Sequence, residues 1–179
     1  LHKLWEAAEP GGYHLEYGYS CMGYEIAGGL GVKMARPDRE VIVLVGDGSY
    51  LMMNSEIATS VMLGLKLTIV VLDNRGFGCI NRLQQGVGGA AFNNLFGQSL
   101  PMPAVDFAAH AASLGAMAEK IDSLAALPAA LARALLSPSA LLFSNAKRSI
   151  APSICFMFWT QAFAWAVLRA LTKFGMAIA

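Results

Sequence analysis

Two runs of aliphatic residues mark the centre of the chain. Residues 41–45 are VIVLV, and residues 65–74 are LKLTIVVLDN with a continuous apolar centre. Continuous apolar runs, without alternation of polar and apolar positions, are typical of parallel strands covered on both faces. Between the runs, residues 54–63 have apolar positions at helical spacing, and Gly64 stands where a helix C-cap would be. The pattern predicts a strand, a helix and a second strand.

The alternation of helix and strand continues on both sides of this unit. Upstream, the small residues of segment 20–36 predict a helix that packs closely on a sheet and stops before Pro37. Downstream, Asp106 is placed to cap a helix. The elements expected there are a helix, a strand, a helix and a strand over residues 107–115, 116–121, 122–136 and 139–143. We therefore predict an α/β domain over residues 1–145, a three-layer parallel sheet with helices on both faces.

Residues 146–179 differ in composition from the rest of the chain. Segment 153–168 is rich in aromatic and aliphatic residues. It is shorter than the roughly 20 apolar residues that cross a bilayer, and it contains Thr160 and Gln161. We expect an atypical apolar tail, amphipathic or poorly packed. A native tail and one produced by a shifted reading frame are both compatible with the sequence.

Composition narrows the class of protein. The 179 residues are 56% hydrophobic and carry 13 Lys and Arg against 12 Asp and Glu, which suits one domain with a sizeable core. Without a basic run the chain does not resemble a nucleic-acid binder, whereas a small molecule that carries phosphate is compatible. Three separated cysteines without CxxC spacing indicate reduced thiols in a cytoplasmic protein. The chain begins without Met or a secretory signal, so we expect it to be the later part of a longer polypeptide.

Polar side chains follow the two central strands where each strand ends. Asp47 comes directly after the first strand, and Asp73 and Asn74 end the second. Because neighbouring parallel strands end at the same edge of a sheet, where ligands of open α/β sheets bind, these residues are expected to be neighbours at a binding site. Carboxylate and amide oxygens suit Mg²⁺, which prefers octahedral oxygen coordination and is usually bound together with substrate phosphates.

The residues around Asp47 suit a diphosphate. Gly46 and Gly48 allow the backbone to approach a ligand closely. Ser49 adds a hydroxyl near the start of the next helix, where N–H groups point at anions. Gly-Asp-Gly alone is also ordinary turn chemistry. Its combination with the second strand and the Asp-Asn pair favours a metal and diphosphate site.

Together these residues resemble the thiamine diphosphate-binding signature, in which GDG is followed, after an interval the size of one βαβ unit, by an Asn-containing pair. The resemblance implies that Mg²⁺ is held by Asp47, by the Asn74 side chain and by the backbone carbonyl of Gly76. The cofactor-binding set that it implies comprises Ser20, Met22, Gly46, Gly48, Ser49 and Asn74.

The resemblance also implies a role for each part of that set. Gly48 and Ser49 contact the diphosphate. Met22 stands at the place of the bulky apolar residue that, in acetolactate synthase-like members, wedges the cofactor into its bent shape. The carbonyl of Ser20 accepts a hydrogen bond from the pyrimidine amino group.

Within this superfamily the chain is most similar to the trihydroxycyclohexane-1,2-dione hydrolases of myo-inositol catabolism. The resemblance covers residues 1 to about 135 and is carried by residues 12–35, 45–61, 65–80 and 105–116. It implies a domain of a homo-oligomeric enzyme that opens a cyclic 1,2-diketone by C–C bond hydrolysis. The alternatives are an acetolactate synthase-like carboligase domain acting on a 2-keto acid, and an inactive fragment. The activating glutamate belongs to a pyrimidine-binding domain that would precede this region.

Other polar residues are expected to have structural roles. His14 in the entry loop and His110 in a helix are interpreted as structural or solvated rather than as proton shuttles. Glu25 is expected to be solvated. Segment 86–103 is shorter and less basic than the corresponding family loop. Within it, residues 87–94 are expected to be a flexible loop or a lid.

Overall fold

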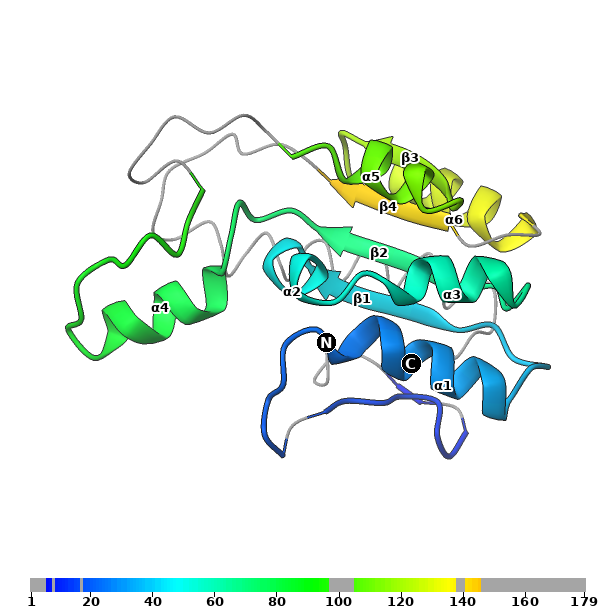
Figure 1. Cartoon of the computed structure of the whole chain (residues 1–179), viewed down its shortest axis with the longest axis horizontal. Coiled ribbons are helices and arrows are strands. Elements are labelled where there is room, and N and C mark those ends of the chain that lie inside the picture. The colour runs from blue at the N-terminus through cyan, green and yellow to red at the C-terminus, as the bar shows by residue number, and fades with distance from the viewer. Residues whose placement is uncertain (1–5, 8, 17, 97–104, 138–140, 146–179) are drawn as a thin grey trace.

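The protein is built on a parallel β-sheet. The computed structural model describes residues 6–7, 9–16, 18–96, 105–137 and 141–145. The strands of these residues are hydrogen-bonded in the order β1-β2-β4-β3, all parallel. In chain order they are β1 (Ile42–Gly46), β2 (Thr68–Leu72), β3 (Met117–Ile121) and β4 (Leu141–Asn145). Their carboxyl ends point in one direction, as the arrowheads in Figure 1 show.

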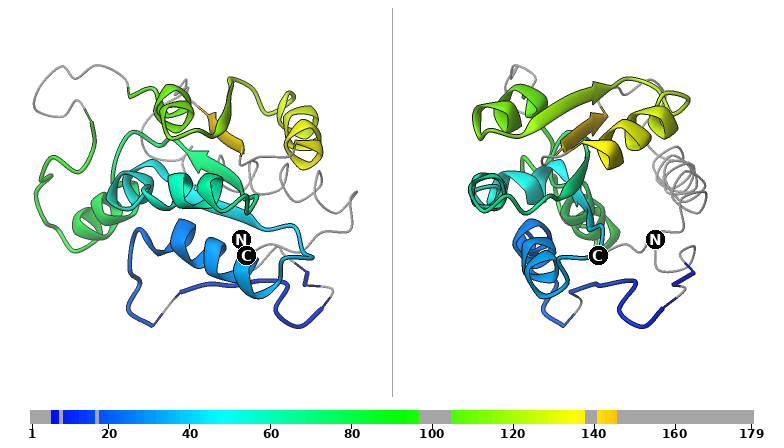
Figure 2. Two further views of the ribbon diagram at one scale, coloured as in Figure 1. Left: turned by 45° about the vertical axis from the view of Figure 1, so that its right-hand side comes forward. Right: turned by 90° about the vertical axis from the view of Figure 1, so that its right-hand side faces the viewer.

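Helices cover both faces of the sheet. Three of them, α1 (Tyr24–Ala35), α3 (Glu56–Met62) and α5 (Phe107–Ser113), lie on one face, and α6 (Leu127–Leu136) lies on the other (Figure 2). Right-handed crossovers explain this arrangement. In the strand order β1-β2-β4-β3, the connection from β1 to β2 crosses the sheet in one direction and the connection from β3 to β4 crosses it in the opposite direction. Right-handed connections that run in opposite directions place their helices on opposite faces of the sheet. The predicted three-layer α/β fold is confirmed.

The core lies between the sheet and the α1, α3, α5 layer. Side chains alternate between the two faces of a strand, and Val43, Val45, Ile69 and Val71 pack into one cluster with apolar residues of these helices. The small residues of α1 allow close contact, since a Cβ added at Gly29 would lie 2.4 Å from Val43 Cγ2. The expectation of a closely packed helix in segment 20–36 is confirmed for Tyr24–Ala35, while residues 20–23 precede the helix.

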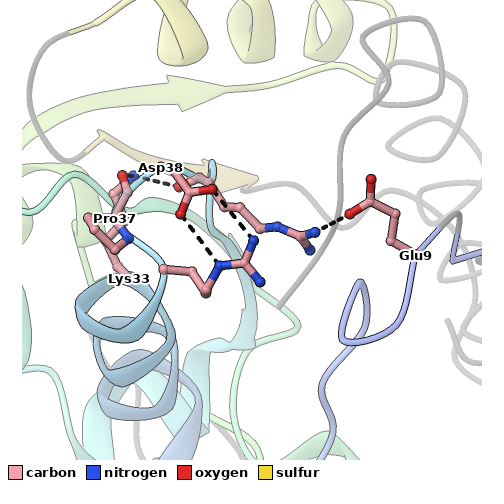
Figure 3. A network of polar contacts seen from close by, with 6 residues as sticks. Glu9, Lys33, Pro37 and Asp38 are labelled. Carbon is pink, nitrogen blue, oxygen red and sulfur yellow. Dashed lines mark hydrogen bonds and ion pairs between the residues drawn. The ribbon is translucent and has the colours of Figure 1, made fainter.

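The end of α1 is held by a lysine. Lys33 is only 9% exposed, and its Nζ donates to the carbonyls of Pro37 at 3.0 Å and Arg39 at 2.5 Å. Figure 3 shows this turn together with Asp38 and with Glu9, which forms an ion pair with Arg39. The lysine thus holds the turn that follows α1, because both carbonyls belong to residues beyond the end of the helix.

Two helices differ from the expectation. The helix predicted over 122–136 begins only at Leu127, because Pro128 is accommodated in the first turn, where a missing N–H costs nothing. A helix that the sequence analysis did not identify, α4 (Gly78–Gly86), follows β2 and lies beyond the carboxyl edge of the sheet (Figures 1 and 2).

The predicted cap of α5 is confirmed, and the predicted tail stays a prediction. Asp106 caps α5, accepting a hydrogen bond from the Ala109 N–H at 2.9 Å. The tail predicted for residues 146–179 lies outside the described residues. Within the part of the chain that the structure describes, no helix combines the length and the apolar character needed to cross a bilayer.

Candidate functional site

The ends of β1 and β2 bring the predicted polar residues together. Gly46, the last residue of β1, pairs with Leu72, the last residue of β2. Asp47 and Asp73 therefore leave the sheet side by side. The helix α2 (Asp47–Met52) begins immediately at Asp47, as Figure 1 shows at the arrowhead of β1.

Asp47 is a completely buried carboxylate. Its Oδ2 accepts a hydrogen bond from the Gly76 N–H at 2.7 Å, and its Oδ1 accepts one from the Asn74 N–H at 3.3 Å. Burial raises the pKa of Asp47 to about 6; the Gly76 N–H opposes this shift, and the charge of Asp73 adds to it. No Lys, Arg or His among the described residues forms an ion pair with it. A buried carboxylate without a cationic partner is costly.

The side chain of Asn74 completes a cluster of polar atoms. One terminal atom of its amide lies 2.8 Å from the Gly76 carbonyl oxygen and 3.1 Å from Asp47 Oδ1. With the amide nitrogen at this position, Asn74 donates to both oxygens. With the amide oxygen there, three oxygens meet with no proton between them, an arrangement that only a cation stabilises.

The spacing of the Asn74 amide from the two neighbouring oxygens fits a small divalent cation. Octahedral Mg²⁺ has bonds of about 2.0–2.1 Å, so neighbouring ligand oxygens stand about 2.9 Å apart. The distances of 2.8 and 3.1 Å around Asn74 match this spacing. Within the described residues no group of three His, Cys, Asp or Glu side chains is placed to hold a metal. The donors available around Asn74 are instead a carboxylate, an amide and a backbone carbonyl, all of which can offer hard oxygen atoms.

The loop that carries the Gly76 carbonyl has an unusual backbone. Arg75 has φ 68° and Gly76 has φ 134°, and a Cβ added at Gly76 would lie 2.4 Å from the Asn94 carbonyl oxygen. Residues 94–96 hold this loop in place: the Phe77 N–H donates to the Asn94 carbonyl at 2.7 Å, and the Phe96 N–H donates to the Arg75 carbonyl at 2.8 Å. Asn94, the last residue of the expected flexible loop or lid, is therefore bonded to the loop that carries the Gly76 carbonyl.

The two glycines around Asp47 differ in what surrounds them. A Cβ added at Gly48 would lie 2.7 Å from a ring carbon of Phe77 and 3.1 Å from the Gly76 carbonyl oxygen. Beside Gly46 there is open space, with no atom within 4 Å of such a Cβ. A ligand can therefore approach the backbone at Gly46, while Gly48 allows α2 and the loop after β2 to pack closely.

The hydroxyl of Ser49 is engaged within the protein. Ser49 is 4% exposed, and its Oγ accepts a hydrogen bond from the Gly23 N–H at 2.6 Å. It also lies 2.9 and 2.8 Å from the two carboxylate oxygens of Glu25. The expectation that Glu25 is solvated is wrong, because α1 directs its half-buried carboxylate at α2. The Ser49 contact with a diphosphate stays a prediction.

Ser20 and Met22 lie in the segment that precedes α1. Ser20 is exposed and has φ 54°, while Met22 is partly buried. The carboxylate of Glu16 accepts hydrogen bonds from the Tyr19 N–H at 2.9 Å and the Cys21 N–H at 2.7 Å. These two N–H groups lower the pKa of Glu16. The backbone on both sides of Ser20 is therefore fixed, but the cofactor contacts of Ser20 and Met22 stay predictions.

Two contacts outside the predicted set support α2 and the entry loop. Tyr50, which is 0% exposed, makes a hydrogen bond of 2.8 Å between its hydroxyl and Nδ1 of His110 on α5. Burial raises the pKa of Tyr50 to about 12. His14 makes a hydrogen bond of 2.7 Å with the Tyr24 hydroxyl. Both histidines therefore join segments of the fold, in keeping with their structural interpretation.

Comparisons with known proteins agree with this architecture. The model of the family described as "Thiamine pyrophosphate enzyme, C-terminal TPP binding domain" matches residues 1–143. Thiamine pyrophosphate is another name for thiamine diphosphate. The match includes both strand ends and the segment that precedes α1.

Two curated relatives share the name 3D-(3,5/4)-trihydroxycyclohexane-1,2-dione hydrolase. The chain is 47% identical over 132 residues to the protein of Shouchella clausii (strain KSM-K16). The aligned region covers 73% of this chain and 21% of the relative. It is 45% identical over 139 residues to the protein of Bacillus thuringiensis (strain Al Hakam), which covers 73% of this chain and 22% of the relative. The chain thus spans about a fifth of the length of these relatives.

A solved structure shows the same fold. The thiamine diphosphate-dependent 4-hydroxybenzoylformate decarboxylase of Rhodococcus jostii RHA1 superposes with a TM-score of 0.61 at 22% sequence identity, covering 72% of this chain and 24% of that chain. At this sequence identity the similarity shows only that the fold is shared. Because the family model matches residues 1–143 and the fold agrees, the chain belongs to the thiamine pyrophosphate enzyme family as a C-terminal TPP-binding domain.

Proposed function

We propose that this domain holds Mg²⁺ through Asp47, the Asn74 amide and the Gly76 carbonyl, and that the cation anchors the diphosphate of thiamine diphosphate. The observation that carries the proposal is that the Asn74 amide lies 2.8 Å from the Gly76 carbonyl oxygen and 3.1 Å from the buried Asp47 carboxylate, which forms no ion pair within the described residues. Coordination would lower the cost of burying that charge, since the cation supplies an opposite charge that no described residue places next to Asp47.

The surrounding residues would position the cofactor. The open space beside Gly46 leaves room for the diphosphate next to the backbone, and Ser20 and Met22 stand in a segment bonded to α2. The predicted set of Ser20, Met22, Gly46, Gly48, Ser49 and Asn74 is part of the proposal. When bound, thiamine diphosphate supplies a carbon nucleophile and an electron sink, while the protein orients it.

For the complete enzyme we propose C–C bond hydrolysis of a cyclic 1,2-diketone. The support is the identity of 47% and 45% to proteins named as trihydroxycyclohexane-1,2-dione hydrolases. Because the chain spans about a fifth of their length, the activating glutamate would come from a pyrimidine-binding domain outside this chain. The 1–145 domain boundary is likewise a proposal.

Thermal unfolding in the presence of Mg²⁺ and thiamine diphosphate tests the proposal. The two together should raise the melting temperature of the parent chain, and neither Asp47→Ala nor Asn74→Ala should respond, because each loses one metal ligand. Asp106→Asn is a matched control, since Asp106 also stands at the start of a helix but lies outside the site. Parent-like responses in both alanine variants would refute the metal site.

A further inference from the structure

Glu25 connects two segments that both contribute to the proposed site. It stands in the first turn of α1, where a carboxylate is already favoured by the helix dipole and needs no side-chain partner. Its carboxylate nevertheless lies 2.9 and 2.8 Å from the Ser49 Oγ of α2. It also accepts a hydrogen bond from the Gly23 N–H at 3.0 Å. Helix stability alone does not explain contacts that reach into a second element.

The same contacts hold residues 20–23, the segment that precedes α1, against the helix α2. Gly23 has φ 91°, and its N–H donates to the Ser49 Oγ at 2.6 Å as well as to Glu25. A Cβ added at Gly23 would lie 3.1 Å from the Met53 Cβ, so this backbone packs directly against the end of α2. Hydrogen bonds to an ionised group are about twice as strong as neutral ones. Glu25 is therefore the charged centre of this contact.

The fastened segment contains both residues expected to touch the thiamine rings. Met22 directly precedes Gly23, and Ser20 lies between the two N–H groups that Glu16 accepts. The Glu16 carboxylate thus holds the start of this segment by binding backbone N–H groups on either side of Ser20. The Glu25 carboxylate holds the end of the segment, at Gly23, against α2. Since α2 begins at Asp47, the Glu25 contact sets the position of Met22 relative to the proposed metal ligand.

We infer that Glu25 is a positioning residue of the cofactor site, which fixes segment 20–23 on α2 so that Ser20 and Met22 are placed for the thiamine rings. The inference rests on the proposed function. It separates two parts of the ligand: the rings depend on Glu25, while the diphosphate and metal depend on Asp47 and Asn74. Glu25→Gln keeps one oxygen that can accept from both groups but removes the negative charge, so the hydrogen bonds from the Gly23 N–H and the Ser49 hydroxyl are no longer made to an ionised acceptor.

Calorimetric titration of the chain with two probes tests this separation. Thiamine diphosphate with Mg²⁺ should bind about tenfold more weakly to Glu25→Gln than to the parent, as expected when hydrogen bonds to an ionised acceptor are replaced by weaker neutral ones. Inorganic diphosphate with Mg²⁺ should bind equally to both. Glu56→Gln is the matched control, because Glu56 is also a half-buried carboxylate in the first turn of a helix, α3. It should bind both probes as the parent does.

Hydrogen exchange gives a second readout that needs no ligand. Exchange at the Gly23 amide should be faster in Glu25→Gln than in the parent, with α3 unchanged. If Glu25→Gln does not fold, Glu25→Asp keeps the charge, shortens the side chain by one methylene and tests the same contact.

The outcomes are distinct. Unchanged binding of thiamine diphosphate to Glu25→Gln would overturn the inference, and so would an equal loss for both probes, which would mean general support of the domain. Failure of the parent to bind inorganic diphosphate with Mg²⁺ would instead refute the proposed function, and the inference that rests on it.

Discussion

Replacing Asp47 by Asn tests whether the buried carboxylate is there to hold a cation. Asp47 is 0% exposed and has no ion-pair partner among the described residues. Asn has the same shape without the charge, and its oxygen can still accept the Gly76 N–H that lies 2.7 Å from Asp47. We expect Asp47→Asn to stabilise the metal-free protein at neutral pH and to abolish its stabilisation by Mg²⁺.

The size of the effect follows from the pKa of Asp47, which burial raises from 3.8 to about 6. Such a shift costs the folded, ionised protein between about 2 and 3 kcal/mol at neutral pH. The stability conferred by protonated Asp47 is present in full below pH 3.8 and is lost as the pH rises through about 6. Part of the gain in Asp47→Asn is offset, since its NH₂ group faces the Asn74 N–H. We therefore expect a net gain of about 1 to 2 kcal/mol.

Urea unfolding with and without Mg²⁺ measures both effects. At 100 times its dissociation constant, Mg²⁺ should stabilise the parent by about 2.7 kcal/mol and Asp47→Asn by nothing measurable. The affinity of the parent for Mg²⁺ should fall below about pH 6, because protons then compete for the carboxylate. A metal-free Asp47→Asn protein that is less stable than the parent, yet is still stabilised by Mg²⁺, would refute this reasoning.

The remaining predictions concern the support of the site, each measured by urea unfolding. Gly76→Ala should lower the free energy of unfolding by more than about 2 kcal/mol, because φ 134° is strained for alanine and the new Cβ would meet the Asn94 carbonyl oxygen. The control Gly31→Ala has open space around the new Cβ and should be neutral or stabilising by up to about 1 kcal/mol. Equal effects of the two substitutions would contradict the loop geometry. His110→Leu should lower the free energy of unfolding by about 2 kcal/mol and Tyr50→Phe by about 1 kcal/mol, because His110→Leu leaves the buried Tyr50 hydroxyl without its hydrogen-bond partner. The reverse order would argue against that hydrogen bond. Lys33→Met should cost about 2 kcal/mol, since two carbonyls lose their donor, and a neutral result would show that water replaces it.

The sequence was sufficient for the central βαβ unit. Continuous apolar runs identified β1 and β2, and the rule that parallel strands share their carboxyl edge placed Asp47 beside Asn74. Both inferences are local or follow from a general topological rule. The Asp106 cap was likewise predictable, because capping needs only neighbouring residues.

Contacts between distant segments could not be predicted in this way. Nothing in the pattern shows that residues 94–96 fold back on Gly76, because that bridge consists of backbone hydrogen bonds, which any side chain permits. Glu25 has the spacing of a solvated first-turn residue, and only the approach of α2 reveals its contact with Ser49. The insertion of β4 between β2 and β3 also depends on tertiary packing.

The central claim is that Asp47, Asn74 and Gly76 share one divalent cation. A crystal structure of the chain grown with Mg²⁺ and thiamine diphosphate tests it most directly. We predict a metal within about 2.1 Å of the Asp47 carboxylate, the Asn74 amide oxygen and the Gly76 carbonyl oxygen. A structure with the diphosphate bound and the metal elsewhere, or with the Asn74 NH₂ group turned toward the Gly76 carbonyl, would contradict the account.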